Sequence, residues 1–252
     1  MTDDERIEIP PPLLDALCNA QHIAVLTGAG VSAESGVPTF RDAQTGLWSK
    51  FNPQELATRE AFARNPKLVW EWYAHRRELV ARAQPNAGHY ALAQLEKRAK
   101  KFTLITQNVD GLHARAGSKN IIELHGNIFR TKCFREDTRA ANWFPTDEIP
   151  PRCARCGSYL RPDVVWFGEM LPRHALDESF RAAESCNVFF SIGTSGVVEP
   201  AASLPFRALQ HGALVIEVNP EETPLSARAT FCLRGAAGVV MPAVIEALVS
   251  EL

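Results

Sequence analysis

The feature that most constrains this chain of 252 residues is a set of four short, almost wholly apolar runs separated by segments of helical periodicity. The runs cover residues 22–27, 102–106, 187–192 and 214–218. Such runs predict strands that are buried on both faces, because a half-buried strand alternates apolar with polar residues. Helices are expected after the prolines at 10–12 and over residues 87–100 and 176–184. The sequence therefore predicts the α/β class, with a parallel sheet covered by helices on both faces.

Charge and cysteine content exclude several classes of protein. Lys and Arg number 27 and Asp and Glu 29, so the formal net charge is only −2. This balance gives no electrostatic attraction toward nucleic acid or an anionic membrane, and we expect neither as a partner. The first six residues are polar, and no apolar run reaches the roughly 20 residues of a membrane-spanning helix. The six cysteines show no secretory spacing, which favours a protein of the reducing cytoplasm. We expect the protein to be a monomer.

A glycine-rich turn follows the first apolar run. Gly28-x-Gly30-x-x-Ala33 fits the loose pattern of a dinucleotide-binding turn, where glycines let backbone N–H groups approach a phosphate. An ordinary strand-to-helix turn has the same composition. A dehydrogenase would also need an acidic residue at the end of a second strand soon afterwards. Residues 37–42 instead predict a loop, in which Arg41 suits a phosphate or a carboxylate.

Polar side chains gather where the second run ends. Gln107, Asn108 and Asp110 follow it directly, and the carboxyl ends of parallel strands are where open α/β sheets bind ligands. An alternative is that Asn108 or Asp110 caps a helix, which would explain one residue but not the whole group. His125 follows a further apolar run, 121–124, and precedes a glycine. A histidine there is either a structural hydrogen-bonding residue or a general base that works near pH 7.

These segments together resemble the signatures of the sirtuins, the NAD-dependent protein deacylases. Residues 28–41 resemble the first sirtuin signature, 106–113 the second, and 123–126 the segment with the catalytic histidine. Residues 164–169 are similar to the substrate-binding strand, and 193–195 and 218–220 to later turns that contact NAD. The matches follow the family order from about residue 22 to 240, which makes the resemblance highly specific.

The resemblance implies both a reaction and the residues that perform it. NAD would be the cofactor, the acyl-lysine oxygen would attack C1′ of the nicotinamide ribose, and His125 would act as base for a ribose hydroxyl. The products would be free lysine, nicotinamide and O-acyl-ADP-ribose. The cofactor-binding residues implied are Gly28, Ala29, Gly30, Phe40, Arg41, Gln107, Asn108, Asp110, Gly193, Thr194, Ser195, Asn219 and Cys232. The acyl-lysine protein substrate would bind as an extended strand against Val164, Val165, Trp166, Phe167 and Gly168.

One cation lies on the apolar side of a predicted helix. In residues 68–80, Arg76 falls on the same stripe as Tyr73 and Leu79, and a buried cation is costly unless an anion meets it. The anion is either an internal carboxylate or one brought by the substrate, unless the side chain extends to solvent. Tyr73-x-x-Arg76 is similar to the Tyr-x-x-Arg of class III sirtuins, which implies removal of succinyl, malonyl and glutaryl groups, with acetyl weaker.

The remaining cysteines predict a zinc site that departs from the sirtuin pattern. Cys153-x-x-Cys156 is one half of a zinc knuckle, but the sequence Cys133-Phe-Arg-Glu136 supplies only one further thiol where the family has two. Glu136 or Asp137 is a candidate fourth ligand, and weak binding or none is the alternative. We expect Cys133, Cys153 and Cys156 to hold a structural zinc ion, away from the chemistry.

Two insertions interrupt the α/β pattern. We expect residues 1–40, 86–127 and 164–252 to form a Rossmann-like NAD-binding domain. Residues 41–85 would form a helical insertion and 128–163 a zinc-knuckle insertion, and together these make a small domain. Two other functions use the same features: transfer of ADP-ribose from NAD to a protein, and non-catalytic sensing of NAD. An intact His125 argues against the sensor.

Overall fold

The computed structural model describes residues 7–38, 52–140 and 148–250. Its larger part is a six-stranded sheet in which every neighbouring pair of strands is parallel. The strands lie in the order β3-β2-β1-β6-β7-β8. Their bounds are β1 Ile23–Thr27, β2 Phe102–Thr106, β3 Ile121–Glu123, β6 Val188–Ile192, β7 Leu214–Val218 and β8 Phe231–Leu233. The four strands predicted from apolar runs are therefore confirmed, and so is the α/β class.

The strand order changes direction between β1 and β6. β2 and β3 lie in turn on one side of β1, whereas β6, β7 and β8 lie in turn on its other side. This is the order of a Rossmann fold, and ligands bind such sheets at the carboxyl ends of the two strands where the order reverses. The residues just after Thr27 and Ile192 therefore mark the expected ligand site.

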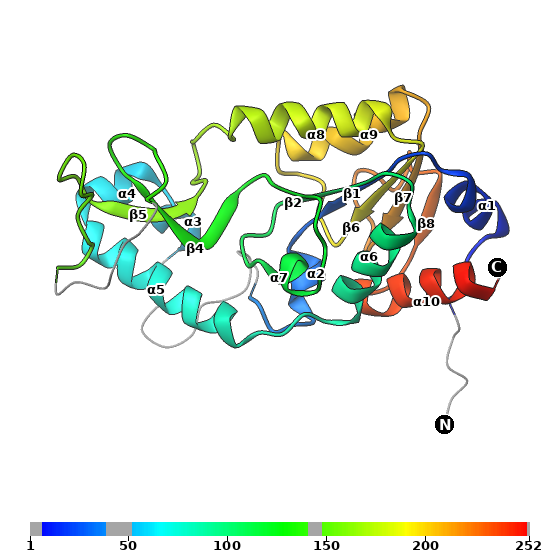
Figure 1. Cartoon of the computed structure of the whole chain (residues 1–252), viewed down its shortest axis with the longest axis horizontal. Coiled ribbons are helices and arrows are strands. Elements are labelled where there is room, and N and C mark those ends of the chain that lie inside the picture. The colour runs from blue at the N-terminus through cyan, green and yellow to red at the C-terminus, as the bar shows by residue number, and fades with distance from the viewer. Residues whose placement is uncertain (1–6, 39–51, 141–147, 251–252) are drawn as a thin grey trace.

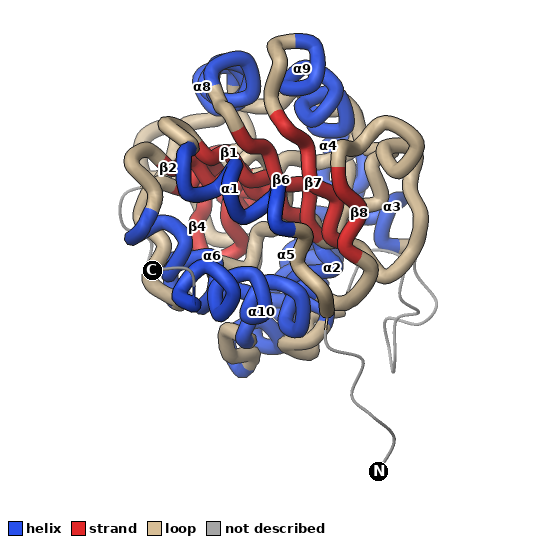
Figure 2. The backbone as a smooth tube through the Cα atoms, turned by 90° about the vertical axis from the view of Figure 1, so that its right-hand side faces the viewer, coloured by secondary structure: helices blue, strands red, loops and turns tan. Residues whose placement is uncertain are grey.

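Helices cover both faces of this sheet, as Figure 2 shows. On one face, α1, α6 and α10 enclose an apolar core with the sheet. On the other face, α8 and α9 form the second core. The helices are α1 Pro11–Asn19, α2 Ala29–Ala33, α6 Ala87–Arg98, α7 Leu112–Arg115, α8 Arg173–Ser185, the 3₁₀ helix Ala201–Ser203, α9 Leu204–Gln210 and α10 Ala237–Ser250. No helix in these described ranges is long and apolar enough to cross a membrane.

A smaller lobe lies beside one end of the sheet, at the left of Figure 1. It contains α3 Pro53–Leu56, α4 Arg59–Arg64, α5 Pro66–Arg82 and the antiparallel pair β4 Gly126–Cys133 and β5 Leu160–Val164. Its apolar core includes Phe62, Trp72, Tyr73, Ile128 and Trp166. We propose the domain boundaries given above on the grounds that these elements come from the two predicted insertions and from the residues that flank them.

The pair β4–β5 was not predicted over most of its length. Its residues carry charged and proline side chains, such as Lys132, Arg161 and Pro162, so they lack the apolar run that marks the other strands. The strand expected at 164–168 overlaps β5 only at Val164, because β5 covers Leu160–Val164 and ends there. Beyond it, Phe167 pairs with Thr58 through an isolated parallel bridge.

Candidate active site

Three glycines bring β1 and β6 into direct backbone contact at the expected ligand site. A Cβ atom on Gly28 or Gly30 would lie 2.7 Å from the carbonyl oxygen of Gly193. Gly193 itself has a positive φ of 58°, and its own Cβ would lie 2.6 Å from the Val31 nitrogen. The N–H of Gly28 donates to the Ile192 oxygen, and that of Gly30 donates to the Gly193 oxygen. These two N–H groups donate within the protein, and the absence of side chains at the glycines lets the two strand ends pack closely.

Amide side chains join the strand ends across this edge of the sheet. The side-chain nitrogen of Gln107 donates to the Thr194 hydroxyl at 3.1 Å, which joins the end of β2 to the end of β6. Asn219, after β7, donates to the Thr194 carbonyl oxygen at 2.9 Å. Asn108 donates to the carbonyl oxygen of Gly28 at 3.0 Å. The structure thus brings together residues predicted from four separate segments of the sequence.

Ser32 is a part of this site that the sequence reasoning missed. Its hydroxyl donates to the Asp110 carboxylate at 2.7 Å and accepts from Asn108 at 3.1 Å. Asp110 also accepts from the Leu112 N–H at 2.8 Å, so the expected capping role is present alongside the contact with Ser32. Burial raises the pKa of Asp110, although the hydrogen bonds from Leu112 and Ser32 oppose this rise. The position of Ser32 within the glycine-rich turn was its only signal in the sequence.

His125 lies in the turn between β3 and β4. Its Nδ1 is 3.0 Å from the carbonyl oxygen of Gln107, which accepts only, so Nδ1 carries a proton. In the neutral ring the lone pair is therefore on Nε2. Burial lowers the pKa of His125, while the bond to Gln107 opposes the shift. A neutral imidazole with a free lone pair on Nε2 has the form that a general base requires.

Arg76 and Tyr73 lie one turn apart on the buried face of α5. Arg76 is 7 % exposed, so its side chain does not extend into solvent. Its guanidinium lies 5.3 Å from the centre of the Trp72 ring, and burial lowers the pKa of Arg76. Tyr73 is 1 % exposed, and its hydroxyl accepts a hydrogen bond from the Trp166 ring nitrogen at 2.9 Å. The helix and the burial of Tyr73 and Arg76 are as the sequence predicts, but the expectation that Leu79 lies on the same apolar stripe is wrong, because Leu79 is 37 % exposed.

Residues 165–168 follow β5, with Trp166 buried and Phe167 exposed. The N–H of Val165 donates to the His125 oxygen, and that of Phe167 donates to the Ala57 oxygen. Trp166 is 2 % exposed and packs into the small lobe, whereas Phe167 is 46 % exposed. The segment expected to bind a peptide is thus bonded to the turn that holds His125.

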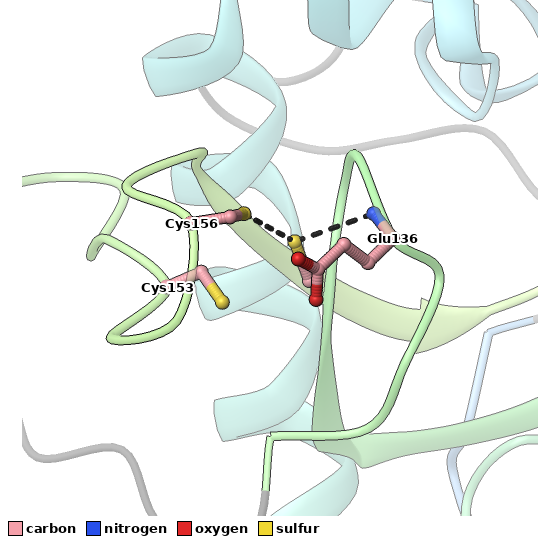
Figure 3. A group of neighbouring side chains, drawn as sticks. Glu136, Cys153 and Cys156 are labelled. Carbon is pink, nitrogen blue, oxygen red and sulfur yellow. Dashed lines mark hydrogen bonds between the residues drawn. The ribbon is translucent and has the colours of Figure 1, made fainter.

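Three cysteines and one acid form a compact cluster in the small lobe, shown in Figure 3. The sulfur atoms of Cys133, Cys153 and Cys156 and a carboxylate oxygen of Glu136 all lie within 4.8 Å of one another. Zinc–sulfur bonds of about 2.3 Å in a tetrahedron require this kind of spacing, so the residues fit a zinc ion. Glu136 also pairs with Arg155. The Asp137 carboxylate lies instead 2.8 Å from the Lys132 ammonium, so the geometry favours Glu136 as fourth ligand.

The structure describes only some of the remaining predicted site residues. Phe40 and Arg41 lie outside the described residues. Ala29 is exposed, Ser195 is half-buried after β6, and Cys232 is exposed on β8. Cys232 lies on the strand beside β7, next to Glu217 in register.

The chain is similar to proteins of one family along nearly all of its length. The model of the Sir2 family matches residues 28–200, so the chain belongs to the Sir2 family. An "NAD-dependent protein deacylase" of Aquifex aeolicus is 59% identical over 206 residues, covering 81% of this chain and 86% of the relative. One of the same name from Methylococcus capsulatus is 51% identical over 250 residues, covering 96% and 98%.

Solved structures agree with this assignment. A crystal structure described as a Sir2 homolog–NAD complex has a TM-score of 0.90 and 47% identity, covering 97% of this chain and 95% of that chain. A Sir2–p53 peptide–NAD+ complex has a TM-score of 0.83 and 32% identity, covering 95% and 98%. The interpretation of the sequence as a sirtuin is confirmed, and with it, at the level of the family, the predictions of an NAD-dependent deacylase and of NAD as cofactor.

Proposed function

We propose that this protein removes acyl groups from protein lysines with NAD and prefers succinyl, malonyl and glutaryl groups to acetyl. The observation that carries the preference is the burial of Arg76, at 7 % exposure, one turn from Tyr73 on the inner face of α5. Acetyl ends in a methyl group, whereas the three preferred groups end in a carboxylate. A guanidinium can bind a carboxylate through two parallel hydrogen bonds, and a neighbouring hydroxyl can add a third.

The state of Tyr73 supports this role. Burial raises the pKa of Tyr73, so the phenol stays protonated and can donate a hydrogen bond at any physiological pH. Arg76 stays charged at the same pH because a guanidinium is not deprotonated in proteins. A neutral donor beside a fixed cation favours an anionic acyl end over a methyl group. Acetyl-lysine lacks the carboxylate that would bind to Arg76 and Tyr73, so we expect acetyl removal to be slower.

His125 is proposed as the general base. Its Nδ1–H bond to the Gln107 oxygen holds the ring in one tautomer, and the lowered pKa keeps Nε2 unprotonated near pH 7. The proton that Nε2 accepts would come from a ribose hydroxyl of the bound NAD. Because the backbone of His125 also bonds to Val165, the base and the peptide-binding segment are fixed relative to each other.

The cofactor would bind along the carboxyl edge of the sheet. NAD supplies the ribose carbon that receives the acyl oxygen and releases nicotinamide. We assign Gln107, Asn108 and Asp110 to the nicotinamide end. Gly28, Ala29, Gly30, Phe40 and Arg41 are assigned to the phosphates, and Gly193, Thr194, Ser195, Asn219 and Cys232 to the rest of the nucleotide. The bonds that join Gln107, Thr194 and Asn219 support one continuous site.

The substrate would bind as an extended strand against residues 164–168. The backbone bonds of Val165 and Phe167 to neighbouring segments support a fixed edge for such pairing. Main-chain pairing tolerates many sequences, so the acyl group rather than the flanking peptide would provide most of the selectivity.

A peptide panel tests the proposal. Acetyl-, malonyl-, succinyl- and glutaryl-lysine forms of one peptide are incubated with and without NAD, and products are identified by mass. We expect Arg76→Met to lower kcat/KM for the succinyl peptide far more than for the acetyl peptide. Equal loss on both peptides would contradict the proposed preference.

Incubation with labelled NAD and an acceptor protein separates deacylation, which yields O-acyl-ADP-ribose, from ADP-ribosyl transfer, which yields labelled protein. Full activity in His125→Ala would refute the proposed base.

A further inference from the structure

Trp166 belongs to the segment expected to bind the peptide, but its side chain is buried in the apolar core of the small lobe. It is 2 % exposed, and its ring lies 5.4 Å from that of Phe62 and 6.2 Å from that of Tyr73, between centroids. Its neighbour Phe167 is 46 % exposed. A residue with this degree of burial acts on the site through the side chains it contacts.

The indole ring is held from two sides. The guanidinium carbon of Arg161 lies 3.4 Å from the ring centre, and Arg161 is 0 % exposed. The backbone N–H of Trp166 donates to a carboxylate oxygen of Glu169 at 2.8 Å. Arg161 and Glu169 are joined by two hydrogen bonds of 2.5 and 2.8 Å, one to each carboxylate oxygen. A bidentate pair of this kind fixes both partners, so the position of the indole N–H is fixed as well.

That N–H determines what the Tyr73 hydroxyl can do. An indole nitrogen is a donor only, and it lies 2.9 Å from the Tyr73 oxygen, which must therefore accept. The hydroxyl hydrogen cannot point toward another hydrogen, so it points away from Trp166. Residues three apart on a helix are neighbours, at about 5–6 Å between Cβ atoms, so Arg76 and the Tyr73 hydroxyl can act on one ligand.

We propose that Trp166 is the residue that fixes the Tyr73 hydroxyl as a donor toward the carboxylate of the acyl group, and so contributes to acyl selectivity. This inference rests on the proposed preference for acidic acyl groups. Without the indole N–H, the hydroxyl rotates between orientations and also accepts from other donors. The hydroxyl then loses rotational freedom when it forms its hydrogen bond to the acyl group, and this loss weakens binding.

The geometry also connects acyl recognition to the peptide edge. Residues 165 and 167 make the backbone bonds of that edge, and the side chain of residue 166 between them reaches Tyr73. A shift of the segment therefore changes the orientation of the Tyr73 hydroxyl. Trp166 is a positioning residue in this scheme and makes no contact with the reacting atoms.

The test uses Trp166→Phe, which keeps an aromatic ring and removes the N–H. One hydrogen bond contributes about 0.5–1.5 kcal/mol, so the ratio of kcat/KM for succinyl over acetyl peptide should fall about two- to thirteenfold. In a Tyr73→Phe background the same substitution should leave that ratio unchanged. Trp70→Phe is the matched control, since Trp70 is also buried but packs beside Cys133 and Leu160 instead.

The outcomes distinguish failure of the role proposed for Trp166 from failure of the proposed function. If Arg76→Met collapses the ratio but Trp166→Phe does not change it, the role of Trp166 is wrong and the proposed function stands. If Arg76→Met leaves the ratio unchanged, the proposed function fails and the role of Trp166 fails with it. An equal fall in the ratio for Trp70→Phe would mark the effect as general disturbance and overturn the inference. Should Trp166→Phe fold poorly, benzothienylalanine at this position replaces the N–H by sulfur and gives the same test.

Discussion

Replacing Glu169 by glutamine should lower the free energy of unfolding of this protein, by an amount that depends on pH. Burial alone would raise the pKa of Glu169, but the hydrogen bonds and charge of Arg161 outweigh it and lower the pKa from 4.5 to about 2. Each tenfold change in the acid constant corresponds to about 1.4 kcal/mol. The ionised carboxylate therefore stabilises the folded state by about 3 kcal/mol at pH 7. Breaking a buried ion pair from one side costs a similar 3–5 kcal/mol or so.

The sign of the pH dependence follows from the direction of the shift. The folded pKa lies below the unfolded one, so the contribution is complete well above pH 4.5 and is lost as the pH falls toward 2. We expect the difference in unfolding free energy between the parent and Glu169→Gln to be about 3 kcal/mol at pH 7. It should fall to about 2 kcal/mol at pH 3.5, because the carboxylate of the unfolded chain is then mostly protonated, whereas that of the folded chain is still ionised.

Urea unfolding followed by tryptophan fluorescence at pH 7, 5 and 3.5 measures this difference. Asp177→Asn is a control of the same chemistry, since its 3.7 Å pair with Arg173 lies at the surface. Exposed pairs contribute about 0–1 kcal/mol, so the control should lie near the parent at every pH. A difference for Glu169→Gln below about 1 kcal/mol at pH 7, or one that does not change with pH, would refute the reasoning.

Three further expectations follow from other parts of the molecule. Gly30→Ala should lose most affinity for NAD in calorimetry, because its Cβ would lie 2.7 Å from a backbone oxygen. Gly212→Ala has nothing within 4 Å but is strained by its positive φ of 84°, so it should lose stability and still bind NAD normally. Glu136→Ala should weaken zinc retention against a chelator, measured by mass, whereas Asp137→Ala should not. Burial lowers the pKa of His22 from 6.5 to about 4, so His22→Gln should unfold with a weaker dependence on pH between 6.5 and 4 than the parent.

The sheet and most of the site could be predicted because their signals are local. A strand buried on both faces leaves an apolar run, and the polar residues that end it, such as Gln107 and Asn108, follow directly in the sequence. The cysteine spacing likewise indicates a metal site. The choice between Glu136 and Asp137 could not be made from spacing, because it depends on Lys132 pairing with Asp137 in three dimensions.

The parts that could not be predicted depend on residues that are distant in sequence or individually unremarkable. Ser32 contacts Asp110 across 78 positions, and no pattern in a single sequence connects the two. The contact of Trp166 with Tyr73 spans 93 positions and likewise leaves no pattern in the sequence. β4 and β5 went unnoticed because each carries charged residues that are buried through pairing, such as Arg161 with Glu169.

The contact between the ends of β1 and β6 limits the substitutions that this chain can accept. At Gly28, Gly30 and Gly193, an added Cβ atom would lie within 2.7 Å of a backbone atom. At Gly28 it would also lie 2.7 Å from the Thr194 Cβ, but replacing Thr194 would not relieve the contact with the Gly193 oxygen. No residue is smaller than glycine, so a substitution at any one of these positions has no compensating partner among the other two. In a mutant library selected for activity, these three positions should stay glycine whichever acyl group is offered. Tyr73 and Arg76, by contrast, should change with the acyl group selected.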